Sequence, residues 1–145
     1  FFVDPEAVNI VLISGVKLIM MCLDVTHQAI ATKTRLEDIL ETKTVTGKNI
    51  VGLMSSLSDI EVVRELFPDG TPVHDAFVTA YLVDNTLTNG KFVNIEIETK
   101  SELSLGQSVI DINSVTGRKK NVYWMNQVND DKLFEIIKFA SSKLP

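Results

Sequence analysis

Residues Lys17 to Leu23 form a nearly continuous apolar run, which constrains the fold more than any other stretch. A run without polar alternation is typical of a strand that is covered on both faces in a parallel sheet. A helix is expected just before it, because Asp4 is a good N-cap, Pro5 suits the first helical position, and Gly15 is favoured just past a helix end. A helix followed by a buried strand is half of a doubly wound α/β unit.

The region between this strand and residue 70 is expected to be helical. Thr34 with Glu37, and Ser58 with Glu61, have the spacing of capping boxes. The turn residues Pro68-Asp69-Gly70 then interrupt the helical region. Between the two capping signals, apolar residues keep helical spacing at Ile50, Leu53, Met54 and Leu57.

After Asp84 the hydrophobic pattern changes to period 2. Strands are expected over residues 93–97, 109–112 and 121–128, and their short connections favour antiparallel pairing. Asn129 then caps a closing helix. The sequence predicts an α/β fold in one domain, 1–145, with a mainly parallel open sheet, an antiparallel excursion and a C-terminal helix.

The composition of the chain argues against some classes of binding partner. The formal charge of −5 argues against a non-specific nucleic-acid binder, which needs a basic surface. No apolar run approaches the length of a membrane span, and the N-terminus lacks signal-peptide features. A single cysteine, Cys22, provides neither a disulfide framework nor a cysteine-based zinc site. We therefore expect a cytoplasmic protein with a small-molecule or protein partner.

Two polar clusters are candidates for chemistry. In the stretch from Thr71 to Leu82, His74 and Asp75 stand at the mouth of an apolar helix. Asp75 could simply be an N-cap, which contributes roughly 0.5 to 2 kcal/mol, and His74 could be a partly buried histidine. The segment Asp24-Val25-Thr26-His27 follows the apolar strand, at the end where ligands gather in α/β sheets, and is interpreted as scaffold.

The stretch from Thr71 to Leu82 completes a set of three motifs with Asp4-Pro5-Glu6-Ala7 and Leu23-Asp24-Val25-Thr26-His27-Gln28. In order and separation this set resembles the nucleoside hydrolases of the inosine-uridine-preferring type. The resemblance covers essentially the whole chain, but only the C-terminal half of the family.

The resemblance implies calcium-dependent hydrolysis of the N-glycosidic bond of ribonucleosides to ribose and free base, as in purine and pyrimidine salvage. By the same resemblance Asp75 is a calcium ligand, and His74 is a catalytic residue that contacts the leaving base or acts as its general acid. Many relatives have proline after the His-Asp pair, whereas this chain has Ala76. Phe67 is the one aromatic residue in the preceding helical segment, so the base preference stays open.

The family's aspartate-rich cluster has no counterpart in this chain. Calcium takes about 6 to 8 oxygen ligands, of which Asp75 can offer at most two. We therefore expect weak or no calcium binding and negligible hydrolase activity from the chain alone. Phe1-Phe2-Val3 has the pattern of the end of a buried strand, so an upstream segment is expected. The open sheet edge would pair with an N-terminal half or with a second copy of the chain.

Three interpretations remain. In the first, the chain is the C-terminal part of a nucleoside hydrolase, as a proteolytic product, a truncated reading frame or one portion of a split enzyme. In the second, it is a truncated, non-catalytic α/β module for binding or oligomerisation. In the third, it is an unrelated small α/β domain whose His-Asp pair only caps a helix.

Overall fold

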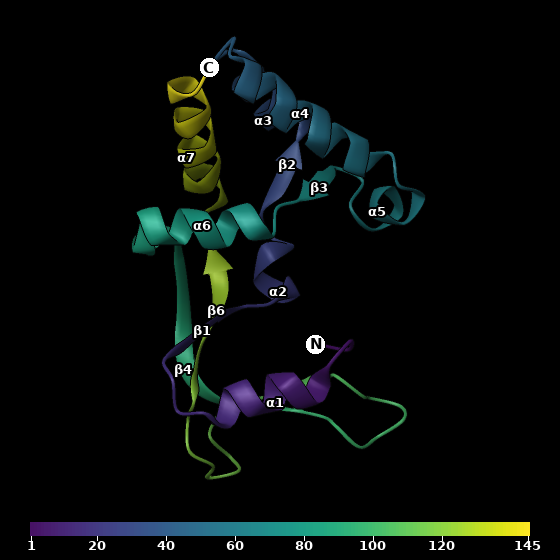
Figure 1. The fold of residues 1–145 in the computed structure, drawn as a ribbon, viewed down its shortest axis with the longest axis vertical. Helices are drawn as coiled ribbons and strands as arrows, with labels where there is room; N and C mark the ends of the chain where they lie inside the picture. The colour runs from purple at the N-terminus through teal and green to yellow at the C-terminus, as the bar shows by residue number, and fades with distance from the viewer. The chain divides into compact units, whose positions relative to one another are not determined.

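The computed structural model describes residues 1–145, which divide into two compact units. The first unit comprises residues 1–21 and 90–126, and the second comprises residues 22–89 and 127–145. Figure 1 labels most of the elements along the chain, but not β5 or the 3-10 helix η1. The helices are α1 (Pro5–Ile13), α2 (Leu23–Thr26), α3 (Lys33–Leu40), α4 (Val45–Ser58), α5 (Glu61–Leu66), α6 (Asp75–Val83), the 3-10 helix η1 (Asn85–Leu87) and α7 (Asp130–Lys143). The strands are β1 (Leu18–Met21), β2 (Ile30–Thr32), β3 (Gly70–Pro72), β4 (Thr88–Ile97), β5 (Ser108–Asp111) and β6 (Val122–Val128).

A mixed four-stranded sheet of order β1-β6-β4-β5 is built mainly from the first unit. β1 runs parallel to β6, with Leu18 opposite Val122, and β4 runs antiparallel to β5. β4 and β6 also run in opposite directions, since Gly90 lies beside Trp124 whereas Val93 accepts a hydrogen bond from the Asn121 N–H. The α/β class, with a parallel pair, an antiparallel excursion and a C-terminal helix, is confirmed.

The first helix has the predicted caps. Asp4 Oδ1 accepts a hydrogen bond from Ala7 N at 2.8 Å, and Pro5 occupies the first turn. α1 ends at Ile13, and Gly15 follows with φ +82°, the left-handed conformation that favours glycine.

The strand predicted over Lys17 to Leu23 is shorter and less covered than expected. β1 is an edge strand of four residues, and Ile19 is 39% exposed. Cys22 and Leu23 leave the strand, because Cys22 is the N-cap of α2 and Leu23 begins that helix. β1 has β6 on one side only, so its apolar residues are not covered as in the middle of a parallel sheet.

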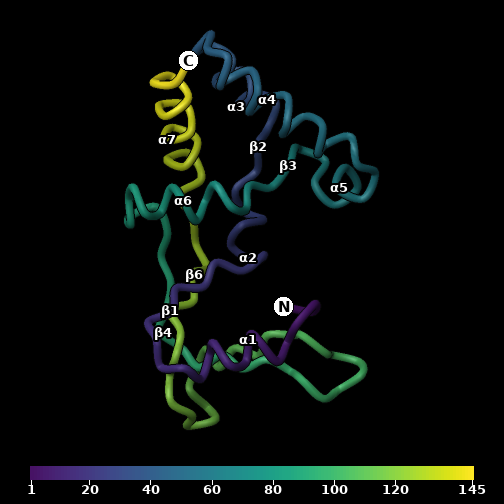
Figure 2. Tube along the Cα trace, in the orientation of Figure 1, coloured from purple at the N-terminus to yellow at the C-terminus, as the bar shows by residue number.

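Helices dominate the second unit. Its fully buried side chains include Ile39, Phe77, Leu87 and Leu133, from α3, α6, η1 and α7. The short strands β2 and β3, which the sequence pattern did not predict, pair antiparallel and run side by side in the trace of Figure 2.

Both capping boxes predicted for the middle region are wrong. α3 is capped by Thr32, whose hydroxyl accepts from Arg35 N, so the true cap lies two residues before Thr34. α5 has Ile60 at its N-cap without a side-chain cap. The Ser58 hydroxyl instead donates to Met54 O at 3.2 Å.

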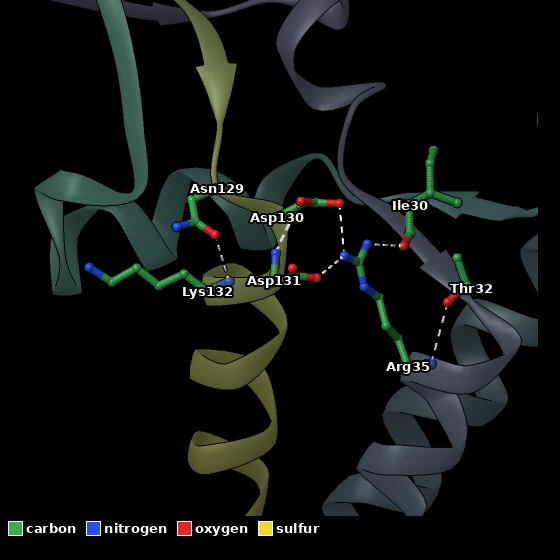
Figure 3. A network of polar contacts seen from close by, with 7 residues as sticks. All are labelled: Ile30, Thr32, Arg35, Asn129, Asp130, Asp131 and Lys132. Carbon is green, nitrogen blue, oxygen red and sulfur yellow. Dashed lines mark hydrogen bonds and ion pairs between the residues drawn. The ribbon is translucent and has the colours of Figure 1, made fainter.

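Arg35 connects the N-terminus of α7 to β2 (Figure 3). Its guanidinium donates to Asp130 at 2.8 Å, to Asp131, and to the carbonyl of Ile30 at 2.9 Å. Asn129 caps α7 as predicted, since its Oδ1 accepts from Lys132 N at 3.1 Å. No helix of the chain combines the length and the apolar character that a membrane span requires.

Candidate active site

His74 and Asp75 lie where β3 leads into α6. The apolar side of α6 anchors this end of the helix, since Phe77 is fully buried and Ala80 is 4% exposed. His74 occupies the N-cap position and Asp75 is the first helical residue, and both residues are exposed. The interpretation of Asp75 as the N-cap is therefore wrong, and the His74 side chain makes no capping hydrogen bond.

The imidazole of His74 is held by a threonine of a distant segment. Thr26 ends α2 and is 3% exposed, and its Oγ1 lies 2.9 Å from Nδ1 of His74. An exposed histidine is thus tied to a buried hydroxyl at one ring nitrogen.

The imidazole of His27 packs against the imidazole of His74. The two imidazoles meet edge to face, with centroids 5.6 Å apart and planes at 61°. His27 also contacts the ring of Phe67, with a centroid distance of 4.7 Å and an angle of 73°. Partial burial lowers the pKa of His27, and the neighbouring His74 lowers it further, although Asp24 opposes the shift. This lowered pKa favours the neutral form of the His27 imidazole.

The structure thus brings together side chains from three segments: Thr26 and His27 from α2 and its C-terminal cap, Phe67 from the residue after α5, and His74. The sequence pattern indicated only a scaffold role for Thr26 and His27, and it gave no sign of their contacts with His74. Their position after the apolar strand, at the end where ligands gather in α/β sheets, could have suggested that they belong to a site.

Asp75 has no cluster of further candidate metal ligands from this chain beside it. Within residues 1–145 no group of three or more histidine, cysteine, aspartate or glutamate side chains is arranged to hold a metal ion. The single carboxylate of Asp75 supplies at most two of the roughly 6 to 8 oxygens that calcium takes. Any calcium bound at Asp75 would need most of its ligands from elsewhere.

Curated proteins with similar sequences include several ribonucleoside hydrolases. A probable ribonucleoside hydrolase of Dictyostelium discoideum is 36% identical over 141 residues, which cover 93% of this chain and 41% of that protein. The pyrimidine-specific ribonucleoside hydrolase RihA of Shewanella sp. (strain ANA-3) is 36% identical over 124 residues, which cover 83% of this chain and 38% of that protein. The chain therefore spans about two fifths of the length of these relatives.

Solved structures share the fold. The purine-preferring ribonucleoside hydrolase from Gardnerella vaginalis matches with a TM-score of 0.78 at 22% identity, covering 96% of this chain and 44% of that one. A plant nucleoside hydrolase matches with a TM-score of 0.77 at 20% identity, covering 95% of this chain and 45% of that one. The sequence model of the inosine-uridine preferring nucleoside hydrolases matches residues 1–135. This chain therefore belongs to the inosine-uridine preferring nucleoside hydrolase family.

Proposed function

We propose that this chain provides the leaving-base side of a site that hydrolyses the N-glycosidic bond of ribonucleosides to ribose and free base. The observation that carries the proposal is the pair at the start of α6, where an exposed histidine held at Nδ1 stands beside an exposed carboxylate. Membership of the nucleoside hydrolase family supports this reaction class.

His74 assists the departure of the base. As the bond between the ribose anomeric carbon and the base nitrogen breaks, its electron pair goes to the base, and a proton or hydrogen bond from the imidazole stabilises the charge that develops there. Water supplies the hydroxyl group that the ribose gains, and the proton that this water releases restores, through solvent, the proton that the imidazole gives to the base. A general acid of this kind contributes about 10² to 10⁴ in rate.

Asp75 is proposed as one calcium ligand among several, the others coming from outside these 145 residues. When bound in such a site, calcium would orient the ribose hydroxyls and the attacking water. On its own the chain would bind calcium weakly and release negligible ribose, because one carboxylate leaves most of the coordination shell to water.

The segment that completes the site is proposed to dock on the free edge of β1. This edge carries unpaired backbone groups, and apolar side chains around it are exposed, including Phe1 at 51%, Val11 at 48% and Ile19 at 39%. An edge of this kind invites pairing with another strand. The proposed occupant is the remaining part of a nucleoside hydrolase, since the matched relatives are more than twice as long as the matched region.

The experiment is a ribose-release assay on inosine and uridine, with calcium or with a chelator. We expect no release from the 145-residue chain alone, and chelator-sensitive release when the chain is co-expressed with the upstream portion of a family member. His74→Ala should then lower kcat by about 10² or more, and Asp75→Ala should weaken calcium dependence. Asp69→Ala, which removes an exposed carboxylate from the turn before β3, is the matched control. Release by the pure chain alone would refute the proposed incompleteness, and full activity of His74→Ala would refute the role of His74.

A second candidate function is an α/β binding or oligomerisation module without turnover. The exposed β1 edge together with the missing metal-ligand cluster favours it. Sedimentation of the pure chain distinguishes the two. A stable homo-oligomer that neither captures an upstream portion nor releases ribose would favour the module.

A further inference from the structure

We infer that Thr26 is a positioning residue for His74: its buried hydroxyl donates to Nδ1, so that the neutral imidazole carries its proton on Nε2 and offers that N–H to a ligand. The claim that Nε2–H donates to a ligand rests on the proposed function of His74. The claim that the proton sits on Nε2 does not, because it follows from the contact between the two side chains.

The direction of the hydrogen bond follows from what each group can do. The hydroxyl of Thr26 always has a proton to donate, and at 3% exposure that proton needs an acceptor within the protein. Nδ1 of His74, at 2.9 Å, is the partner of this hydroxyl. If Nδ1 carried the proton instead, the threonine proton would lose its acceptor, and a buried unpaired polar group costs about 1 to 3 kcal/mol. The neutral ring is therefore expected to carry its proton on Nε2.

The backbone around both residues is well fixed. Thr26 N donates to Cys22 O at 3.1 Å, and Thr26 O accepts from Ala29 N at 3.1 Å. Ala29 O in turn accepts from Val73 N at 2.9 Å, which ties the segment of Thr26 to the residue just before His74. The distance between the hydroxyl and Nδ1 is thus set by hydrogen-bonded backbone on both sides.

His27 restricts the rotation of the His74 ring about its bond to Cβ. Its imidazole packs edge to face against the imidazole of His74, and it also contacts the ring of Phe67. A half-turn of the His74 ring about its bond to Cβ would remove Nδ1 from Thr26 and leave a carbon against the hydroxyl. The hydrogen bond with Thr26 and the packing against His27 therefore favour one orientation of the His74 imidazole, in which Nε2 points away from Thr26.

This arrangement determines what His74 can recognise. An Nε2–H group donates to a ring nitrogen or a carbonyl oxygen, the acceptor groups that purines and pyrimidines share. A ring with its proton on Nδ1 would present a lone pair to those acceptors and repel them. Thr26 thus selects the donor form of His74 that suits a departing base.

The test is the tautomer of His74 in the 145-residue chain, read from two-bond ¹H–¹⁵N correlations of the imidazole at a pH where both histidines are neutral. We expect the wild-type spectrum to show Nε2–H for His74, with Nδ1 as the acceptor. A wild-type spectrum with the proton on Nδ1 would overturn the inference without any variant. The readout does not involve turnover, so failure of the ribose-release assay and failure of this inference are distinguishable.

Two variants and a control complete the test. Thr26→Val keeps the shape of the side chain but lacks the hydroxyl, so the pure Nε2–H signal should be lost to a mixture of tautomers. Thr26→Ser should restore the wild-type signal. Thr71→Val removes another buried threonine hydroxyl, whose partners are Ser58 and Met54, and should leave His74 unchanged. If Thr26→Val retained the wild-type tautomer, Thr26 would not position His74.

Discussion

The side-chain amide of Asn121 acts as a strand partner for the backbone of Ile95. Asn121 Oδ1 accepts from Ile95 N at 2.9 Å, and Asn121 Nδ2 donates to Ile95 O at 3.0 Å. The same Nδ2 reaches Leu12 O at 3.3 Å, so one carboxamide joins β4 to the end of α1. Ile95 is fully buried, so water has no ready access to its backbone groups as a substitute partner.

Asn121→Ala should therefore destabilise the protein by about 2 to 4 kcal/mol, because a buried backbone N–H and a buried carbonyl each lose a partner at a cost of about 1 to 3 kcal/mol. Urea unfolding followed by circular dichroism measures the change. Asn89→Ala, at an exposed position of β4, should stay within about 0.5 kcal/mol of the wild type. Equal stability of the two variants would contradict the partner role of Asn121.

Two glycine substitutions should act in opposite directions. A Cβ at Gly90 would collide with the backbone of Trp124 and Met125 on β6, so Gly90→Ala should force the strands apart and destabilise by about 1 to 3 kcal/mol. Gly52 lies within α4, and a Cβ added there would meet open space, so Gly52→Ala should stabilise by up to about 1 kcal/mol. Thermal melts should show a lower melting temperature for Gly90→Ala and a higher one for Gly52→Ala. Destabilisation by Gly52→Ala would contradict the prediction for that position.

The sequence predicted those features that depend on interactions between neighbouring residues, such as helix caps. Asp4 and Asn129 cap their helices as expected, because a cap depends on residues within one turn. The ribbon of β2 and β3 was missed, since three-residue strands carry no measurable period. Thr34 and Thr32 offer similar capping chemistry, and the pairing of β2 decides which one ends the strand and begins α3.

The site was predictable only in part, for the same reason. His74 and Asp75 could be selected as candidates because they are adjacent, open an apolar helix and match the family's motif. The contact between Thr26 and His74 joins residues 48 positions apart and depends on how α2 packs beside the loop before α6. No periodicity of one segment contains that information.

Arg35 should be a strong determinant of stability in the second unit. Its side chain is 18% exposed, donates to Asp130, Asp131 and Ile30 O, and lies over the ring of Phe134 at 4.5 Å. Arg35→Ala should cost about 1.5 to 3 kcal/mol, as for hydrogen bonds to charged groups, measured by urea unfolding.

Two further variants at this helix test the cause. Arg35→Lys should recover little of the loss, because an ammonium cannot reach several acceptors with the planar fork of a guanidinium. Lys33→Ala removes an exposed pair with Glu37 at 3.9 Å and should cost less than about 0.5 kcal/mol. Full recovery by Arg35→Lys would show that charge alone suffices.

Asp84 should contribute to acid stability. Hydrogen bonds from Lys132 and Thr86 lower the pKa of Asp84 from 3.8 to about 2 in the folded chain. Because the folded pKa is depressed, the contribution is present above about pH 4 and is lost as the pH falls from about 4 to about 2. Carboxyl-detected NMR should give this low pKa. Asp84→Asn should flatten the pH dependence of stability in that window, and an Asp84 pKa at the ordinary aspartate value would contradict the role of the ion pair.

Cys22 should react slowly with alkylating reagents in the folded chain. Burial raises the pKa of its thiol from 9.0 to about 11, and the nearby carboxylate of Asp24 adds to the shift. A shift of about two pKa units reduces the thiolate fraction about 100-fold at about pH 8, and the thiolate is the reactive form. Iodoacetamide should therefore modify Cys22 about 100-fold more slowly in buffer than in urea, with the rate rising about tenfold per pH unit up to about pH 10. Asp24→Asn should speed the reaction by removing a negative charge beside the thiolate. A folded-state rate equal to that in urea would show that the thiol is not protected.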